Sequence, residues 1–315
     1  MKNIYKIFIL SLLIFLSSCS NGESFWIDFS WVPINMGGHQ FDKAAIFLNF
    51  KIDSFPNRFS AQFDTGAESF FKENTISSFL ENNTKLSKKL DKLSGNRNLN
   101  NLPVKLALTN LNLKFKDTVV LQKKVLFYPN TGKTFTKEQL NTSRIHLGTL
   151  GVDLLKNKIL IMDYVSKRMA ILEEIPWNFR IKKSIPFALD QINRVHLPIK
   201  IRDNSYYVMF DTGSSIFTLL TNDKTVWDKV KRNSNIDTLS VSSFGKYYDV
   251  FGSTIEEDIH LMDMNLKKHK IHYSTRPMDD TYLNGIKVIG TTGNKLFLDK
   301  VIAINYKNNS LNILE

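Results

Sequence analysis

The segments Phe63-Asp64-Thr65-Gly66-Ala67 and Phe210-Asp211-Thr212-Gly213-Ser214 decide the fold of this 315-residue chain. Each contains the tripeptide Asp-Thr-Gly, and each ends an apolar run with the composition of a β-strand. One Asp-Thr-Gly is a weak signal, because Asp and Gly are common in β-turns. Two copies, one in each half of the chain, raise the question of whether their surroundings repeat as well.

The surroundings repeat on both sides of the tripeptides. Upstream, residues 47–52 and 59–63 correspond to 196–201 and 206–210, and each set predicts two strands that lead into an acidic turn. Downstream, a segment aligns without a gap at an offset of 142 residues, whereas the tripeptides are 147 apart. Residues shared in this segment include Gly148/Gly290, Thr149/Thr291, Gly151/Gly293, Leu154/Leu296, Tyr164/Tyr306 and Leu172/Leu314. Self-similarity of this kind indicates an internal duplication with loops of slightly different length.

Alternating apolar and polar residues dominate the chain, which predicts a mainly β fold. Residues 118–121 and 124–128 are two further β-rich runs bounded by polar turns. The predicted helices also come in pairs. They are expected over 74–82 and 222–232, with brief helices at 153–156 and 295–298. The boundary between the two halves is expected within 173–183, where Pro176 and mixed charges interrupt both the strand and the helix patterns.

The first residues have the layout of a secretory signal. Lys2 and Lys6 precede the apolar run 7–16, which is too short for a comfortable membrane span. The sequence Leu16-Ser17-Ser18-Cys19 resembles the signal of bacterial lipoproteins, in which the cysteine becomes the lipidated mature N-terminus. We therefore expect a signal peptide over 1–18, a lipidated tether over 19–24 and a folded part from residue 25. An ordinary cleaved signal with an incidental cysteine is the alternative.

Composition bears on the possible partners. The formal net charge is +12, and it falls to +10 when Lys2 and Lys6 leave with the signal. A basic domain can bind nucleic acid or anionic lipid, but the lysines are scattered along the sequence and no nucleic-acid-binding motif is present, so we expect no nucleic-acid partner. The six histidines show no zinc-binding spacing, and we expect no metal and no other cofactor.

The two motifs and their surroundings resemble the pepsin-like and retropepsin-like aspartic peptidases. The resemblance covers 58–71 with 145–172 and, again, 206–220 with 288–314. It implies a two-lobed, β-barrel-like acid-protease fold with pseudo-twofold symmetry, an N-terminal lobe over 25–178 and a C-terminal lobe over 179–315. In that family the two motifs meet at the symmetry axis, and an extended peptide lies between the lobes.

Two aspartates are residues suited to the hydrolysis of a peptide bond by an activated water. Two facing carboxylates cannot both ionise cheaply, so Asp64 and Asp211 would share a proton. One would take a proton from an attacking water while the other donates to the scissile carbonyl oxygen. Which aspartate plays which role stays open, because their titrations are coupled. The remaining motif residues would support the two loops: Thr65, Gly66, Thr212, Gly213 and Ser214.

The resemblance also implies contacts with substrate and with the chain beneath the motifs. Ala67 and Glu68 are possible substrate-binding residues, although Glu68 could equally be a solvated turn residue. Hairpin flaps are expected near 94–96 and 244–248, where Gly245 and Tyr247 are further candidates. The segments that end at Gly151 and Gly293 correspond to the apolar element that packs beneath each active-site loop, with a poorer match in the second copy.

The sequence therefore predicts a monomeric aspartic endopeptidase that hydrolyses peptides or proteins and is anchored to the bacterial cell envelope through Cys19. Three alternatives stay open. The first is a non-catalytic lipoprotein of the same fold that binds peptides or inhibitors, since fold does not fix function. The others are a β-rich adhesin or carbohydrate-binding module, and a metal-dependent hydrolase.

Overall fold

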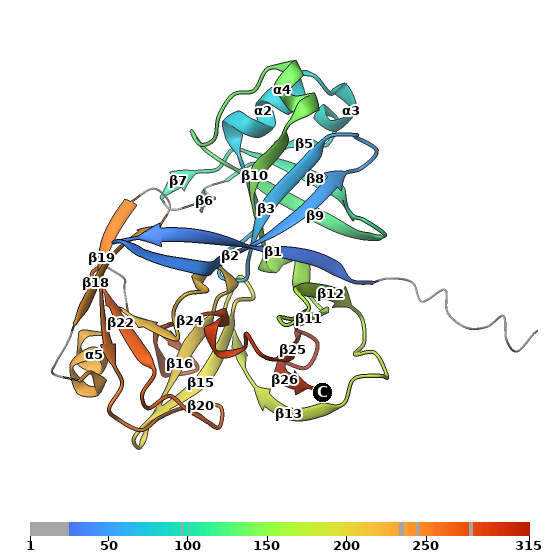
Figure 1. The fold of residues 1–315 in the computed structure, drawn as a ribbon. Coiled ribbons are helices and arrows are strands. Elements are labelled where there is room, and N and C mark those ends of the chain that lie inside the picture. Colours follow the sequence, from blue (N-terminus) through green and yellow to red (C-terminus); the bar gives the residue numbers. More distant parts are fainter. Residues whose placement is uncertain (1–24, 96, 100, 233–235, 244–245, 277–279) are drawn as a thin grey trace, which may run out of the picture.

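The computed structural model describes residues 25–95, 97–99, 101–232, 236–243, 246–276 and 280–315. The described chain is mainly β, as the alternating pattern predicts, and its strands form two large sheets and one small one (Figure 1). The signal and tether segments, with Cys19, lie outside these residues.

The larger sheet connects the two halves of the chain. Its strands follow the order β13 (Ile181–Pro186), β26 (Ser310–Leu314), β25 (Val301–Asn305), β11 (Ile159–Asp163), β12 (Arg168–Leu172), β1 (Ile27–Met36), β2 (His39–Ile52), β3 (Arg58–Asp64), β10 (Arg144–Gly151), β4 (Phe70–Lys72), β9 (Thr118–Tyr128), β8 (Leu106–Phe115) and β5 (Leu90–Lys92). The C-terminal strands β25 and β26 thus pair with each other, and β25 also pairs with β11 of the N-terminal half.

The second sheet belongs to the C-terminal half alone. Its order is β18 (Asp237–Ser243), β19 (Lys246–Thr254), β22 (Lys270–Ser274), β17 (Leu219–Thr221), β24 (Ile286–Thr292), β16 (Asn204–Phe210), β15 (Val195–Ile201), β20 (Ile259–Leu261) and β21 (Met264–Asn265). Two short strands flank this path, β14 (Ala188–Leu189) beside β15 and β23 (Thr281–Leu283) beside β24. The small sheet is β6 (Asn98–Leu99) with β7 (Leu102–Pro103).

The repeat found in the sequence is a repeat of structure. The upstream runs form the antiparallel pairs β2–β3 and β15–β16. In each half the second strand of the pair then lies parallel to a later strand, β10 in the first half and β24 in the second. This arrangement brings the downstream repeated segment beside each Asp-Thr-Gly. The two runs predicted at 118–121 and 124–128 are one continuous strand, β9.

The helices are few and short. Helices α2 (Glu73–Glu81), α3 (Thr84–Ser87) and α4 (Lys137–Thr142) lie together at the top of Figure 1, and α5 (Lys224–Val230) lies beside the second sheet. Helix α5 begins later than predicted, because the Asp223 carboxylate caps it by accepting from the N–H groups of Thr225 and Val226. The predicted brief helices are 3₁₀ turns, η1 (Val152–Leu155) and η3 (Asn294–Leu296), and a third such turn is η2 (Thr212–Ser214).

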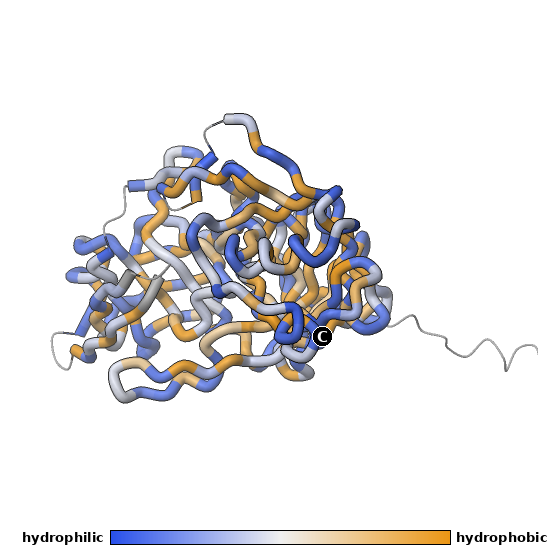
Figure 2. The backbone as a smooth tube through the Cα atoms, turned by 90° about the horizontal axis from the view of Figure 1, so that it is seen from above, coloured by the Kyte–Doolittle hydropathy of each residue, from blue (hydrophilic) through white to orange (hydrophobic). Residues whose placement is uncertain are grey.

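Phenylalanine side chains form much of the core, and one cluster of buried residues spans both halves. Figure 2 shows hydrophobic stretches running through the interior strands and hydrophilic residues at many outer turns. Phe63 and Phe210, which precede the two tripeptides, are both fully buried. Each Asp-Thr-Gly loop is therefore attached to a strand that burial holds in place.

Candidate active site

Each Asp-Thr-Gly loop packs against a glycine at the end of the parallel strand beside it or directly after that strand. Asp64 is in register with Gly151 at the end of β10, and Phe210 is in register with Thr292, next to Gly293. A Cβ atom on Gly151 would lie 2.2 Å from the Ala67 carbonyl oxygen, so no side chain fits there. The same holds for Gly293, which packs against the carbonyl of Ser214. The second copy, a poorer match in sequence, thus takes the same position as the first.

The two loops are joined by reciprocal hydrogen bonds between their threonines. The N–H of Thr65 donates to Oγ1 of Thr212 at 3.0 Å, and the N–H of Thr212 donates to Oγ1 of Thr65 at 3.1 Å. Each hydroxyl then donates to a carbonyl of the other half, Thr65 to Phe210 at 3.3 Å and Thr212 to Phe63 at 3.1 Å. Both threonines are fully buried. The contact between the loops that the resemblance implies is therefore present.

The same loops bring the two carboxyl groups together. Oδ1 of Asp64 accepts from the Gly66 N–H at 2.9 Å, and Oδ1 of Asp211 accepts from the Gly213 N–H at 2.7 Å. A Cβ atom on Gly66 would lie 2.5 Å from the Asp211 carboxyl carbon, and one on Gly213 would lie 2.6 Å from that of Asp64. Each carboxyl group therefore lies against the glycine of the opposite loop, a position that only glycine permits.

This position changes the protonation of the pair. Burial raises the pKa of Asp64 well above its ordinary value, and the negative charge of Asp211 raises it further. Burial also raises the pKa of Asp211, although hydrogen bonds with Asp64 and with the Gly213 N–H oppose this. Because two adjacent carboxylates repel each other, the pair retains a proton above the pH at which an isolated aspartate loses it.

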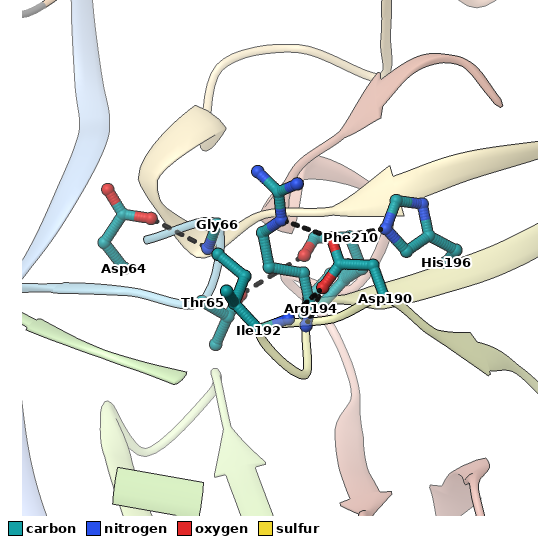
Figure 3. Close-up of polar contacts among 8 residues, drawn as sticks. All are labelled: Asp64, Thr65, Gly66, Asp190, Ile192, Arg194, His196 and Phe210. Carbon is teal, nitrogen blue, oxygen red and sulfur yellow. Dashed lines mark hydrogen bonds and ion pairs between the residues drawn. The ribbon is translucent and has the colours of Figure 1, made fainter. Parts of the chain in front are cut away.

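A cation that sequence reasoning missed lies near the pair. The positive charge of Arg194, just before β15, lowers the pKa of both Asp64 and Asp211. Figure 3 shows its side chain between the first loop and Asp190, which holds it in place. The Asp190 carboxylate accepts from Nε of Arg194 at 2.6 Å and from its backbone N–H at 2.9 Å. No motif in the sequence marks this turn.

Asp190 itself is held as an anion. Burial would raise the pKa of Asp190, but hydrogen bonds with His196 and Arg194 outweigh this and leave it below the ordinary range. Nε2 of His196 lies 3.3 Å from Oδ2 of Asp190 (Figure 3). Arg194 and His196 also line a cavity of about 100 Å³ that continues along β24. The cation near the aspartates is thus fixed by a partly buried ion pair.

Beneath the loops, the two halves use different supporting residues. In the first half, the Gly151 N–H donates to Oγ of Ser69, and Ser69 donates from both N–H and hydroxyl to the Asp153 carboxylate. In the second half, the Asn294 amide donates to the Thr212 carbonyl at 3.0 Å and to the Ser215 hydroxyl at 2.6 Å. The duplication does not predict this difference, because these residues differ between the repeats.

A bond between the halves completes this support. The Tyr164 hydroxyl, in the turn after β11, donates to the Asn294 side-chain oxygen at 2.6 Å, with both groups buried. Burial raises the pKa of Tyr164, which therefore stays protonated as the donor. Its repeat partner Tyr306 is also buried, but its hydroxyl has no hydrogen-bond partner among the described residues. The two tyrosines match in sequence and differ in role.

The remaining predicted site residues are placed as follows. Glu68 forms an ion pair with Arg97, beside β6, so its carboxylate is already engaged. Ser214 lies in η2, where its N–H donates to the Asp211 carbonyl at 3.1 Å. Tyr247 is 76% exposed near the start of β19. Gly245 lies outside the described residues.

Comparison with known proteins found no relative of this chain among protein families or curated proteins. No protein-family model matches the chain, and no curated protein is detectably similar to it. Within the described residues, no group of three or more His, Cys, Asp or Glu side chains is placed so that it could hold a metal ion. None of the helices in the described part of the chain is long and apolar enough to cross a membrane.

Proposed function

We propose that this chain is an aspartic endopeptidase with the two-lobed, pepsin-like fold. One observation carries the proposal: two Asp-Thr-Gly loops, joined by reciprocal threonine hydrogen bonds, hold Asp64 and Asp211 against each other. The larger sheet joins residues 25–178 to residues 179–315, the second sheet lies within 179–315, and matching strand pairs occur in both halves, which supports the two-lobed assignment.

The proposed mechanism follows from the shared proton. A water bound between the carboxyl groups gives a proton to the ionised aspartate and attacks the peptide carbonyl carbon. The protonated aspartate donates its proton to the carbonyl oxygen, which forms a neutral tetrahedral diol. Proton transfer to the leaving nitrogen and collapse of the diol then break the C–N bond. The raised pKa values keep the required singly protonated pair populated into mildly acid conditions.

The test compares peptide hydrolysis by the native protein and two variants. A mixed peptide library is incubated with residues 20–315 between pH 3 and pH 8. Asp64→Asn and Asp211→Asn each keep the side-chain size but remove the ionisable group, and each is expected to lower turnover by at least about 10³-fold, the usual scale for a lost acid–base group. Asp203→Asn, at an exposed turn, is the matched control and keeps full activity.

Two results would count against peptide hydrolysis by this pair. Activity that survives both substitutions would place the chemistry elsewhere. A folded protein that cleaves no peptide at any pH, yet binds a peptide-like inhibitor equally well with and without the two aspartates, would identify a peptide-binding protein instead.

We also propose that the protein is a bacterial lipoprotein, with Cys19 as its lipidated first residue. The sequence pattern around Leu16 and Cys19 supports this. Labelling with a radioactive fatty acid in cells tests it directly: the native chain takes up label and sediments with membranes, whereas Cys19→Ala takes up none. Label that persists in Cys19→Ala would exclude this anchoring site.

A further inference from the structure

A basic cavity lies at the opposite end of β3 from Asp64. It has a volume of about 610 Å³ and lies where the β2–β3 and β8–β9 turns meet the first residues of β3 and β10. Five cationic residues line it: Lys51, Arg58, Lys114, Lys116 and Arg144. The fold therefore brings three lysines and two arginines from separate parts of the sequence to one cavity.

Four of the five cationic residues form two directly opposite pairs on neighbouring strands of the sheet. Lys51 of β2 is directly opposite Lys114 of β8, and Arg58 of β3 is directly opposite Arg144 of β10. Directly paired residues point to the same face of a sheet, and like charges in this position destabilise the pairing. Two like-charge pairs at one end of one sheet are an unfavourable arrangement unless an anion compensates them.

Nothing among the described residues compensates these charges. All five cations are exposed, and none forms an ion pair within the described part of the chain. The only acidic residue lining the cavity is Asp53, and its carboxylate is already bound by Lys89 at 2.8 Å and by the Asn112 N–H at 3.1 Å. The cavity therefore presents five uncompensated positive charges to a ligand.

The floor of the cavity is apolar. Phe50 and Phe59 are buried beneath it, with ring centroids 6.2 Å apart, and Phe55 forms part of the wall. The buried floor fixes the strands that carry the cations, so the five exposed side chains are anchored around one cavity. Two guanidinium groups beside three ammonium groups are suited to phosphate oxygens, which arginine binds through two parallel hydrogen bonds.

We propose that this cavity binds a phosphate-bearing anion. Arg58 and Arg144 would bind the phosphate oxygens, and Lys51, Lys114 and Lys116 would neutralise the remaining charge. The site is separate from the aspartate pair, since the six residue steps from Arg58 to Asp64 along an extended strand span about 20 Å. Both a free phosphate and the headgroup of an anionic lipid carry this chemistry. The β8–β9 turn and the start of β1 lie at the same edge of Figure 1.

The test uses residues 20–315, which retain every described residue, with two probes. Calorimetric titration with inorganic phosphate reports a free anion. Co-sedimentation with vesicles of phosphatidylcholine and phosphatidylglycerol at 7:3, against pure phosphatidylcholine, reports a lipid headgroup. Arg58→Gln/Arg144→Gln removes one cation pair, and Lys85→Gln/Lys88→Gln, on exposed residues at α3, removes the same charge elsewhere.

We expect binding of at least one probe, reduced at least tenfold by Arg58→Gln/Arg144→Gln and less than twofold by the control pair. Binding of vesicles alone assigns the site to a lipid headgroup, and binding of phosphate alone assigns it to a soluble anion. Failure of both probes, or equal losses in the two double variants, would overturn the proposal. Because Arg58→Gln/Arg144→Gln relieves a like-charge pair, its melting temperature should not fall, which separates lost binding from lost folding. Peptide hydrolysis should be unchanged, so this test is independent of the proposed function.

Discussion

The properties of the two aspartates come from the few residues that touch them. Each carboxylate accepts from a glycine N–H of its own loop and lies against the glycine of the other loop. Each glycine thus has two roles: its N–H donates a hydrogen bond to the aspartate of its own loop, and its lack of a side chain leaves room for the carboxyl group of the opposite loop. A methyl group on either one would displace a carboxylate, so the third residue of each Asp-Thr-Gly is fixed by the opposite loop as well as by its own turn.

The raised pKa of Asp64 predicts a change in stability with pH. A folded-state pKa above the unfolded value means that the native state binds the proton more tightly. This contribution is fully present below the unfolded pKa of about 4 and is lost as pH rises through the folded pKa. Asp64→Asn removes this loss, so at pH 7 its free energy of unfolding should exceed that of the native protein by about 1.4 kcal/mol for each unit of pKa elevation. Its melting temperature at pH 7 should therefore be higher.

Thermal melting at pH 3 and pH 7 checks this expectation. The advantage of Asp64→Asn should disappear near pH 3, where the native aspartate is protonated as well. Asp203→Asn, on the exposed turn, should match the native protein at both values. A destabilisation of Asp64→Asn that is the same at both pH values would show that lost hydrogen bonds, and not the titration, dominate.

The position of Arg194 predicts how its substitution would change the pH dependence of the proposed peptide hydrolysis. Its charge lowers the pKa of both aspartates, so Arg194→Gln should raise both values. The acid limb of kcat/KM, where the pair takes up its second proton, should therefore move to higher pH. Arg194→Lys keeps the charge and should restore most of the native profile. A uniform loss of activity with an unmoved limb would instead indicate a contact with substrate.

At the scale of elements, the repeat predicts much of the fold, because a duplicated strand pair must bury the same face twice. The strand pairs before each tripeptide and helix α2 are found where the sequence places them. The supporting bonds are not predictable in this way, since Ser69 and Asn294 occupy positions that are not equivalent. Nor is Arg194, because its proximity to the aspartates depends on the fold of a turn that carries no motif.

The same substitution, Tyr to Phe, should affect stability differently at Tyr164, in the turn after β11, and at Tyr306, in the matching turn after β25. Tyr164→Phe removes the donor to Asn294 and leaves a buried amide oxygen unsatisfied, which should lower stability by about 1–3 kcal/mol. Tyr306→Phe removes a buried hydroxyl that has no partner among the described residues, so it should leave stability unchanged or raise it. Urea unfolding of both variants measures the difference, and equal destabilisation would mean that the two hydroxyls are equally engaged.

At the scale of the whole molecule, the halves are joined by backbone pairing as well as by side chains. Strand β11 pairs with β25 over five residues, with Ile161 directly opposite Ala303. Both residues are fully buried, and the main core cluster continues across the halves. A substitution that disrupts the β11–β25 pairing, which we call the seam between the halves, destabilises both halves at once. We therefore expect the described chain to unfold in a single cooperative transition.

Ala303→Asp tests this cooperativity, because it buries a carboxyl group at the seam with no cation opposite. The expected cost is about 3 kcal/mol or more, seen in calorimetry as one transition at lower temperature whose van't Hoff and calorimetric enthalpies agree. Asn178→Asp adds the same charge on the exposed segment between the halves and should leave the melting temperature within about 1 °C, as surface substitutions do. If the halves were independent, Ala303→Asp would split the transition and leave one part at its native temperature. A single transition at lower temperature would show that the pairing of Asp64 with Asp211 depends on strands β11 and β25, which are far from both aspartates in sequence. The two loops meet only while both halves are folded.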